Sequence, residues 1–113
     1  MLSLVTAVIK PHMVDPVNQA LKAAGITGMT ITEVKGFGRQ GGHTETYRGA
    51  EYAIDFVPKV KVEVLVLTEQ ADAVISTISS SANTGKIGDG KVWVTSVDHV
   101  LRIRTGEMGG EAL

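Results

Sequence analysis

The sequence predicts an α+β domain of the ferredoxin-like type, with the element order β-α-β-β-α-β. One antiparallel four-stranded sheet would carry two helices on one face. Apolar runs and strict alternation mark the strands, whereas apolar side chains three and four residues apart mark the helices. The two β-α-β-like halves follow each other without a linker, so we expect a single domain over residues 1–113.

The first half begins with an apolar run from Leu2 to Ile9, which is typical of a strand buried on both faces. In the helix that follows, Asp15 is expected at the N-cap and Pro16 at the first helical position. Gly25 is expected to end that helix. The alternating stretch from Met29 to Lys35 predicts the second strand.

The second half begins with the clearest strand, Lys59 to Leu67, in which valines occupy every other position. Thr68 is expected to cap the second helix. The last strand region is expected in two pieces, Val92 to Val94 and Val100 to Arg104. The buried stripe predicted for the second helix is Ala71, Val74, Ile75, Ile78 and Ala82.

Two short helices cover only one face of so apolar a sheet. The other face needs a second layer, and packing of sheet faces between identical chains would supply it. The sequence therefore predicts a homo-oligomer.

Composition limits the classes of function. The formal net charge is -1, so the chain as a whole has no electrostatic attraction for nucleic acid. The absence of cysteine excludes disulfides and thiolate metal sites, and it fits a reducing cytoplasm. His12, His43 and His99 lack the spacing of a zinc site. The N-terminal apolar run, about eight residues long, is too short for a signal peptide or a membrane span.

A glycine-rich stretch from Thr84 to Lys91 joins the second helix to a strand. Its glycines let the backbone approach an anion, and its two lysines add charge, but it lacks the residue order of a P-loop. A phosphate site and an ordinary turn are both open on the residues alone. Arg102 and Arg104 alternate on one predicted strand face, which suits either a phosphate clamp or a solvated edge strand.

The connection from Gly36 to Tyr52 is long, polar and rich in glycine. Such connections are uncommon in compact domains unless they have a function. Within it, Gln40 is a weak ligand for a hard cation unless phosphate oxygens complete the shell, as is common for Mg²⁺. In the flanking strands, Thr30 and Glu63 either contact a ribose or base edge or simply face solvent.

These stretches together resemble the PII signal-transduction family. The segment YRGAEY, residues 47–52, is similar to the nucleotidylylation signature of the family's T-loop. The segment TGKIGDGKVWV, residues 84–94, is similar to its B-loop signature. Gly41 stands where the family usually has lysine, and Asn83 where arginine is common. Further matches occur in order and without gaps over Gly28 to Thr30, Glu33 to Gln40, Asp55 to Val60 and Arg102 to Glu107.

The resemblance implies a homotrimer with ATP or ADP in the clefts between subunits. It implies a T-loop over about residues 37–55 between strands two and three, a B-loop over about residues 83–91 and a C-terminal loop over about residues 102–113. The implied nucleotide contacts are Thr30, Gly36, Gly38, Arg39, Gln40, Glu63, Leu65, Gly88, Asp89, Gly90 and Lys91, with Arg102 and Arg104 of the adjacent subunit. The implied 2-oxoglutarate contacts are Gln40, Gly41, Gly42, Lys59 and Gly88, with Gln40 also binding Mg²⁺.

The resemblance also implies a nitrogen and energy sensor that is not an enzyme. Its T-loop would contact ammonium channels and nitrogen-metabolism enzymes or regulators through Tyr47, Arg48 and Tyr52. A nucleotidylyltransferase would modify Tyr52. We expect a cytoplasmic protein that reaches the membrane reversibly through a channel partner, without nucleic-acid partners. The alternatives are a slow nucleotide hydrolase and a small-molecule-binding regulatory module of the same fold.

Overall fold

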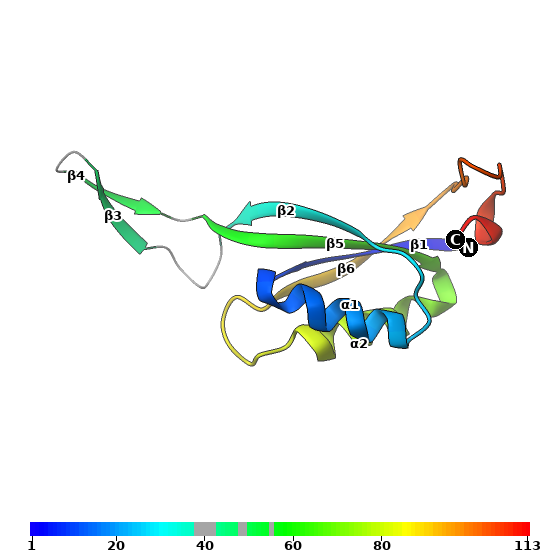
Figure 1. The fold of residues 1–113 in the computed structure, drawn as a ribbon, viewed down its shortest axis with the longest axis horizontal. Helices are drawn as coiled ribbons and strands as arrows, with labels where there is room; N and C mark the ends of the chain where they lie inside the picture. The colour runs from blue at the N-terminus through cyan, green and yellow to red at the C-terminus, as the bar shows by residue number, and fades with distance from the viewer. Residues whose placement is uncertain (38–42, 48–49, 55) are drawn as a thin grey trace.

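The computed structural model describes residues 1–37, 43–47, 50–54 and 56–113, with the backbone alone for 43–47 and 50–54. Two helices cover one face of a four-stranded antiparallel sheet whose strand order is β2-β5-β1-β6 (Figure 1). The predicted ferredoxin-like α+β fold is therefore confirmed. The strands of this sheet are β1 (Leu2–Ile9), β2 (Thr30–Gly36), β5 (Val57–Leu67) and β6 (Gly90–Val97), and the helices are α1 (Val14–Ala23) and α2 (Ala71–Ala82).

A second, two-stranded sheet lies within the connection between β2 and β5. It consists of β3 (His43–Tyr47) and β4 (Ala50–Ile54), which pair antiparallel from His43 opposite Ile54 to Tyr47 opposite Ala50. The sequence predicted a long polar connection here, without strands of its own. Pairing of the two arms with each other satisfies backbone groups that the main sheet does not reach.

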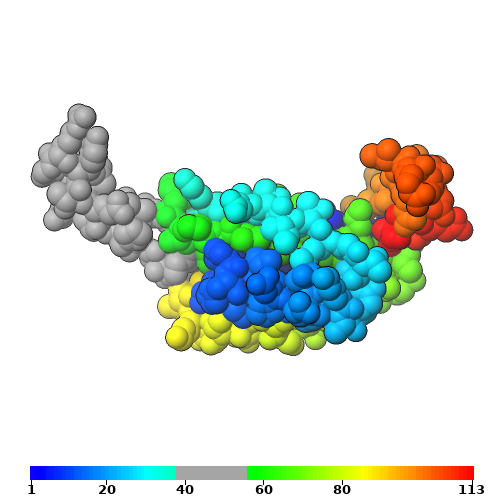
Figure 2. All heavy atoms as spheres, in the orientation of Figure 1, coloured from blue at the N-terminus to red at the C-terminus, as the bar shows by residue number. Residues whose placement is uncertain are grey.

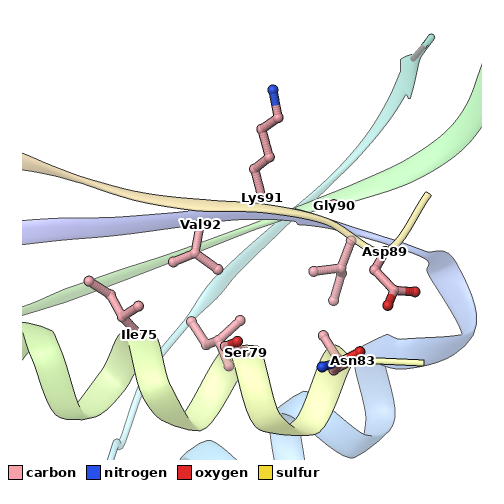
Figure 3. Close-up of a pocket in the computed structure, with 10 residues that line it drawn as sticks. Ile75, Ser79, Asn83, Asp89, Gly90, Lys91 and Val92 are labelled. Carbon is pink, nitrogen blue, oxygen red and sulfur yellow. The ribbon is translucent and has the colours of Figure 1, made fainter. Parts of the chain in front are cut away.

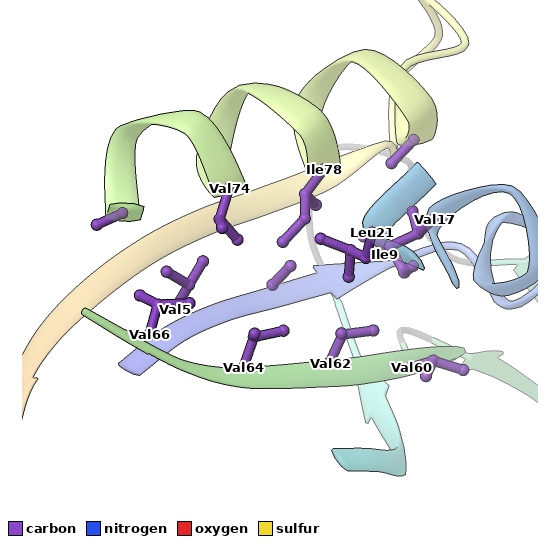
Figure 4. Close-up of a cluster of buried hydrophobic side chains, with 13 residues drawn as sticks. Val5, Ile9, Val17, Leu21, Val60, Val62, Val64, Val66, Val74 and Ile78 are labelled. Atoms are coloured by element: carbon purple, nitrogen blue, oxygen red, sulfur yellow. The ribbon is translucent and has the colours of Figure 1, made fainter. Parts of the chain in front are cut away.

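The core lies between the sheet and the helices (Figure 4). Alternate residues of β1 and β5 point into it, as the period of two along a strand requires. The stripe predicted for α2 is confirmed, with Ala71, Val74, Ile78 and Ala82 buried and Ile75 packed against them. The fully buried side chains that dominate the core by volume are Ile9, Leu21, Ile78, Val5, Val17, Val62, Val64 and Val66.

The predicted helix starts are wrong by a short distance. A 3-10 turn over Pro11–Met13 leads directly into α1, so Asp15 lies inside the first turn and is not the N-cap. A second 3-10 turn, Thr68–Gln70, precedes α2, and the Thr68 hydroxyl pairs with Ser3 Oγ at 2.9 Å and does not cap the helix. In both places a 3-10 turn lies directly before the α-helix, so the α-helix begins without the predicted cap. Gly25 does end α1, with a φ of 88°.

The C-terminal region differs most from the prediction. The strand β6 is longer than the predicted piece, whereas Val100 to Arg104 is not a strand. Instead, Leu101 forms an isolated bridge with Met108, and the Arg102 N–H donates to the Glu107 carbonyl at 2.8 Å. Gly106, with a φ of 74°, allows the tight reversal between them. We call residues 100–113 the C-terminal hairpin; its last turn is a 3-10 helix over Gly109–Ala112.

The sheet face opposite the helices has no second layer within the described residues. Strand pairing shows that the side chains on this face change from apolar to charged along the strands, with leucines at one end and lysines at the other. Leu65 and Trp93 on this face are 42% and 43% exposed. The leucine end carries Leu2, Leu4, Leu65 and Leu67, the middle Thr6, Thr30 and Glu63, and the lysine end Lys59, Lys61 and Lys91. Separately, none of the described helices has the length and apolarity needed to cross a membrane.

Candidate functional site

Many of the described residues that the sequence singled out, although neither Arg102 nor Arg104, line two cavities near opposite ends of the uncovered sheet face. The loop-side cavity, of about 520 Å³, is lined by Gly36, Lys59 and the stretch Lys86 to Lys91, with Val8, Phe37 and Trp93. The tail-side cavity, of about 770 Å³, contains Thr30, Glu63 and Leu65, together with Ala112 and Leu113 at the end of the chain. Each cavity unites residues from distant parts of the sequence.

The loop-side cavity is built on a backbone that only glycine permits. Gly88 and Gly90 have φ angles of 97° and 105°, in the left-handed region. A Cβ added at Gly90 would lie 1.8 Å from the Val8 carbonyl oxygen, so β1 and the loop pass each other too closely for any side chain. Bare backbone of this kind lets N–H groups approach an anion.

Successive residues of β6 face opposite sides of the sheet. In Figure 3, Lys91 points away from α2, whereas Val92 points toward Ile75 on that helix. The cavity in Figure 3, of about 420 Å³, lies on the helix side of the sheet and shares Asp89, Gly90 and Lys91 with the loop-side cavity. The lysine belongs to the loop-side cavity, where its charge favours an anionic ligand.

Lys59 supplies a second cation to the loop-side cavity. Only 8% of this residue is exposed, and its Nζ donates to the Gly88 carbonyl oxygen at 2.5 Å. Burial lowers the pKa of Lys59, the nearby charge of Lys10 lowers it further, and the Asp89 carboxylate partly offsets both. A lysine held in this way is a fixed counter-charge for a carboxylate or phosphate.

The Asp89 carboxylate is bound by its own loop. It accepts from the backbone N–H groups of Thr84 at 2.7 Å and Gly85 at 3.0 Å, and from the Thr84 hydroxyl. Lys10 Nζ forms an ion pair with it at 3.0 Å. These hydrogen bonds, with those from Thr84 contributing most, hold the pKa of Asp89 well below its usual range. Only the backbone of Asp89 is therefore suited to an anion.

The arginines do not share a strand face, contrary to the prediction, because their segment is part of the C-terminal hairpin. Arg102 is half-buried; its Nη1 lies 3.3 Å from Glu107 Oε1, and its Nη2 donates to the Leu113 carbonyl at 2.6 Å. Arg104 is exposed in the turn. In the tail-side cavity itself, Thr30 and Glu63 are directly paired across β2 and β5.

The glycine-rich loop and the C-terminal hairpin lie at opposite ends of β6. The strand from Gly90 to Val97 spans about 23 Å at 3.3 Å per residue. Figures 1 and 2 show the same separation, with the yellow loop after α2 at one end and the orange and red hairpin at the other. One chain therefore cannot bring Gly90 and Arg102 to the same phosphate group.

Several predicted site residues lie outside the described residues or have only their backbone described. Tyr52 pairs with Glu45, and Tyr47 with Ala50, in the β3–β4 sheet. The predicted metal ligand is among the residues that lie outside, which are Gly38, Arg39, Gln40, Gly41, Gly42 and Arg48.

Four contributors to the loop-side region were missed from the sequence. Lys10 had been read only as the end of a strand, yet it contacts both Thr84 and Asp89. Phe37 and Phe56, on either side of the β3–β4 segment, form an edge-to-face pair with ring centroids 5.8 Å apart. Trp93 could have been found, because strand alternation places it on the same face as Lys91. No local pattern indicates the other three.

The fold and the loop-side cavity together define a ferredoxin-like domain with a glycine-rich, lysine-bearing loop at one end of its sheet. A family profile for "Nitrogen regulatory protein P-II" matches residues 2–107. The chain belongs to this family, as its motifs had indicated.

Relatives along the whole chain support the same conclusion. The nitrogen regulatory protein P-II of Rhizobium etli is 56% identical over 112 residues, covering 99% of this chain and 100% of that protein. The nitrogen regulatory protein P-II 1 of Escherichia coli is 58% identical over 109 residues, covering 96% and 97%. A solved structure of Arabidopsis thaliana PII bound to citrate has a TM-score of 0.82 and 39% identity, covering 99% of this chain and 92% of that one.

These bacterial relatives are named as nitrogen regulatory proteins, and the family acts in signalling and not as enzymes. The prediction that the chain is a signalling protein and not an enzyme is therefore confirmed.

Proposed function

We propose that this chain reports nitrogen and energy status in the cytoplasm by binding ATP or ADP and 2-oxoglutarate with Mg²⁺. The observation that carries the proposal is the loop-side cavity, where the glycine backbone of residues 88–90 lies beside the buried ammonium of Lys59. The glycine backbone suits phosphates and the Lys59 ammonium suits a carboxylate, so two anionic ligands can bind side by side.

The nucleotide phosphates would bind the backbone of Gly88 to Lys91, and the base and ribose would bind beside Thr30, Glu63 and Leu65. Arg102 and Arg104 would complete the phosphate contacts. The span of about 23 Å along β6 supports a contribution of these arginines from another chain. A closed ring of three subunits, each giving its loop to one neighbour and its hairpin to the other, would allow this contribution and cover the exposed sheet face.

2-Oxoglutarate would bind beside the nucleotide. Its distal carboxylate would replace the Gly88 carbonyl oxygen as the acceptor of the hydrogen bond from the Lys59 ammonium. Its keto-acid oxygens would share Mg²⁺ with the ATP phosphates and Gln40, a ligand set of the hard oxygen type that Mg²⁺ prefers. Gln40 lies outside the described residues, so the metal rests on the family resemblance. The polycarboxylate in the Arabidopsis thaliana structure is in keeping with an anion site in this family.

Target proteins would be contacted through the β3–β4 segment. Tyr47, Arg48 and Tyr52 would dock on ammonium channels and on nitrogen-metabolism enzymes or regulators. Nucleotidylation of Tyr52 would add bulk and negative charge beside Arg48 and so block docking. Association with the membrane would then be indirect and reversible, through the channel.

Titration calorimetry tests the proposal directly. We expect ATP and ADP to bind, and 2-oxoglutarate to bind only when Mg²⁺ and ATP are both present, because ADP lacks the γ-phosphate that shares the metal. Lys59→Gln should weaken 2-oxoglutarate by about 2–5 kcal/mol. Lys61→Gln, two residues along the same face, is the matched control and should bind almost normally. The proposal fails if no nucleotide binds, or if 2-oxoglutarate binds equally well with ADP or without Mg²⁺.

A further inference from the structure

We propose that Lys10, Thr84 and Asp89 form a positioning cluster, which shapes the glycine-rich loop before any ligand binds. None of the three needs to touch a ligand through its side chain to do so. The consequence for binding rests on the proposed nucleotide function, whereas the shape of the empty loop does not.

The cluster joins three parts of the loop region. Asp89, next to β6, accepts hydrogen bonds from Thr84 and Gly85 just after α2. Lys10, at the end of β1, donates to the Thr84 hydroxyl at 3.2 Å and lies 3.0 Å from the Asp89 carboxylate. These contacts join the two ends of the loop to each other and, through Lys10, to the end of β1, an inner strand of the sheet.

Glycines on both sides of Asp89 explain why the loop needs such a fastening. Gly88 and Gly90 are free to adopt many backbone conformations, and ordering them costs entropy. The side chain between them has contacts with Thr84, Gly85 and Lys10, so its position fixes the backbone on either side. If the loop is ordered in the free protein, a ligand does not have to order it.

The cluster also divides the loop into two functional halves. The N–H groups of Thr84 and Gly85 already bind a carboxylate, and Gly85 N–H is shared with Asn83 Oδ1 at 2.7 Å. They are therefore not open to a phosphate. The anion-binding part of the loop begins at Gly88, although the sequence motif begins at Thr84.

Lys59 extends the effect to the second ligand. It donates to the Gly88 carbonyl, and Gly88 is the residue directly before Asp89. A change that releases Asp89 should therefore also move the acceptor that holds the Lys59 ammonium. The positioning cluster thus supports both the phosphate part and the carboxylate part of the cavity.

The first test uses the ligand-free protein. A charged acceptor gives an amide proton a marked downfield NMR shift, so the Thr84 and Gly85 amides should both move upfield in Asp89→Asn, where the acceptor becomes neutral. Both amides should also change their shifts in Lys10→Gln, where the carboxylate loses its ion-pair partner. Lys22→Gln removes one positive charge from an exposed lysine of α1 that lines neither the loop-side nor the tail-side cavity, and it is the matched control. Unmoved amides in Asp89→Asn would overturn the cluster, whether or not nucleotide binds.

The second test measures ADP affinity without Mg²⁺. Asp89→Asn and Lys10→Gln should each weaken ADP about tenfold, as expected for the loss of one charge-assisted hydrogen bond. The double variant should bind no worse than Asp89→Asn alone, because the two residues act as a unit. Equal losses in Lys10→Gln and Lys22→Gln would show a general charge effect and overturn the proposal. If Asp89→Asn does not fold by circular dichroism, Lys10→Gln still decides between these outcomes.

Discussion

The glycine-rich loop of residues 83–91 and the C-terminal hairpin of residues 100–113 both contain cationic side chains and glycines. They differ in which side chains are engaged by contacts within the chain. In the loop, hydrogen bonds within the chain engage an acidic side chain, Asp89, and leave the Lys91 ammonium facing the cavity. In the hairpin, the chain engages the cation itself, because Arg102 contacts Glu107 and the Leu113 carbonyl.

The difference shows where a ligand has to rearrange the protein. The loop is prepared for an anion, since its internal contacts order the backbone without using the groups that would bind. In the hairpin, Arg102 would have to give up its contacts with Glu107 and Leu113 before it could reach the ligand proposed for another chain. A ligand should therefore meet the loop with little structural change and the hairpin with a larger one.

The largest effect should come from adding a side chain at Gly90, where the loop passes close to the backbone of β1. In Gly90→Ala the new Cβ would lie 1.8 Å from the Val8 carbonyl oxygen, so the loop must move. We expect ADP affinity to fall about 100-fold, the upper end of what overpacking costs. Gly85→Ala is the matched control, because its φ is also positive, at 77°, but no atom lies within 4 Å of the added Cβ. Equal losses in the two variants, measured by calorimetry, would show that the close approach is unimportant.

The next effect concerns the protonation of Lys59. Its pKa is lowered by burial. In the proposed function, 2-oxoglutarate binds the charged form of this amine. Affinity measured with Mg-ATP should therefore fall as the pH rises through the lowered pKa, which lies below the ordinary lysine value of 10.5, by up to about tenfold per pH unit. The dependence should be absent in Lys59→Gln. A fall that begins only near the ordinary lysine value would contradict the burial of this charge.

A smaller effect should follow from freeing Arg102. Its partner Glu107 is half-exposed, so the ion pair contributes at most about 1 kcal/mol. Glu107→Gln should tighten ADP by up to about fivefold, whereas Glu111→Gln, an exposed acid near the end of the same hairpin, should leave it unchanged. Weaker binding in Glu107→Gln would mean that the pair holds Arg102 in place for the ligand and does not compete with it.

The smallest effect is on stability in acid. The lowered pKa of Asp89 means that the folded protein holds this carboxylate ionised more strongly than the unfolded chain does. The stabilisation is present above the ordinary aspartate value of 3.8 and is lost as the pH falls through the lowered pKa. Urea titrations should show wild type more stable than Asp89→Asn at neutral pH, with a gap that narrows in acid. A gap that does not depend on pH would argue against an ionised partner for Thr84 and Gly85.

The fold could be predicted because its elements have strong local periods. The alternating valines of β5 and the helical stripe of α2 each indicate one structure, and both are confirmed. The segment from Val100 to Arg104 alternates equally well, yet it is not a strand, because Gly106 turns the chain back on itself. The contact between Arg102 and Glu107 could not be predicted, because it produces no periodic pattern in the sequence.

The site was predicted less completely than the fold. Glycines and lysines together indicate an anion-binding loop, and family resemblance adds the ligands. Lys10 and Asp89 lie at almost opposite ends of the sequence, and only the adjacent packing of β1 and β6 brings them together. Long-range pairs of this kind have no local signature.

The central claim is that each nucleotide site is completed by two chains, one giving its loop and the other its hairpin. It can be tested by co-refolding Gly90→Ala with Arg102→Ala, two variants that should each bind ADP poorly alone. If the claim is right, random assortment in a closed ring should restore about a quarter of the sites to wild-type affinity. If loop and arginine act on one chain, the mixture will contain no intact site, and its ADP binding will stay at the level of the separate variants.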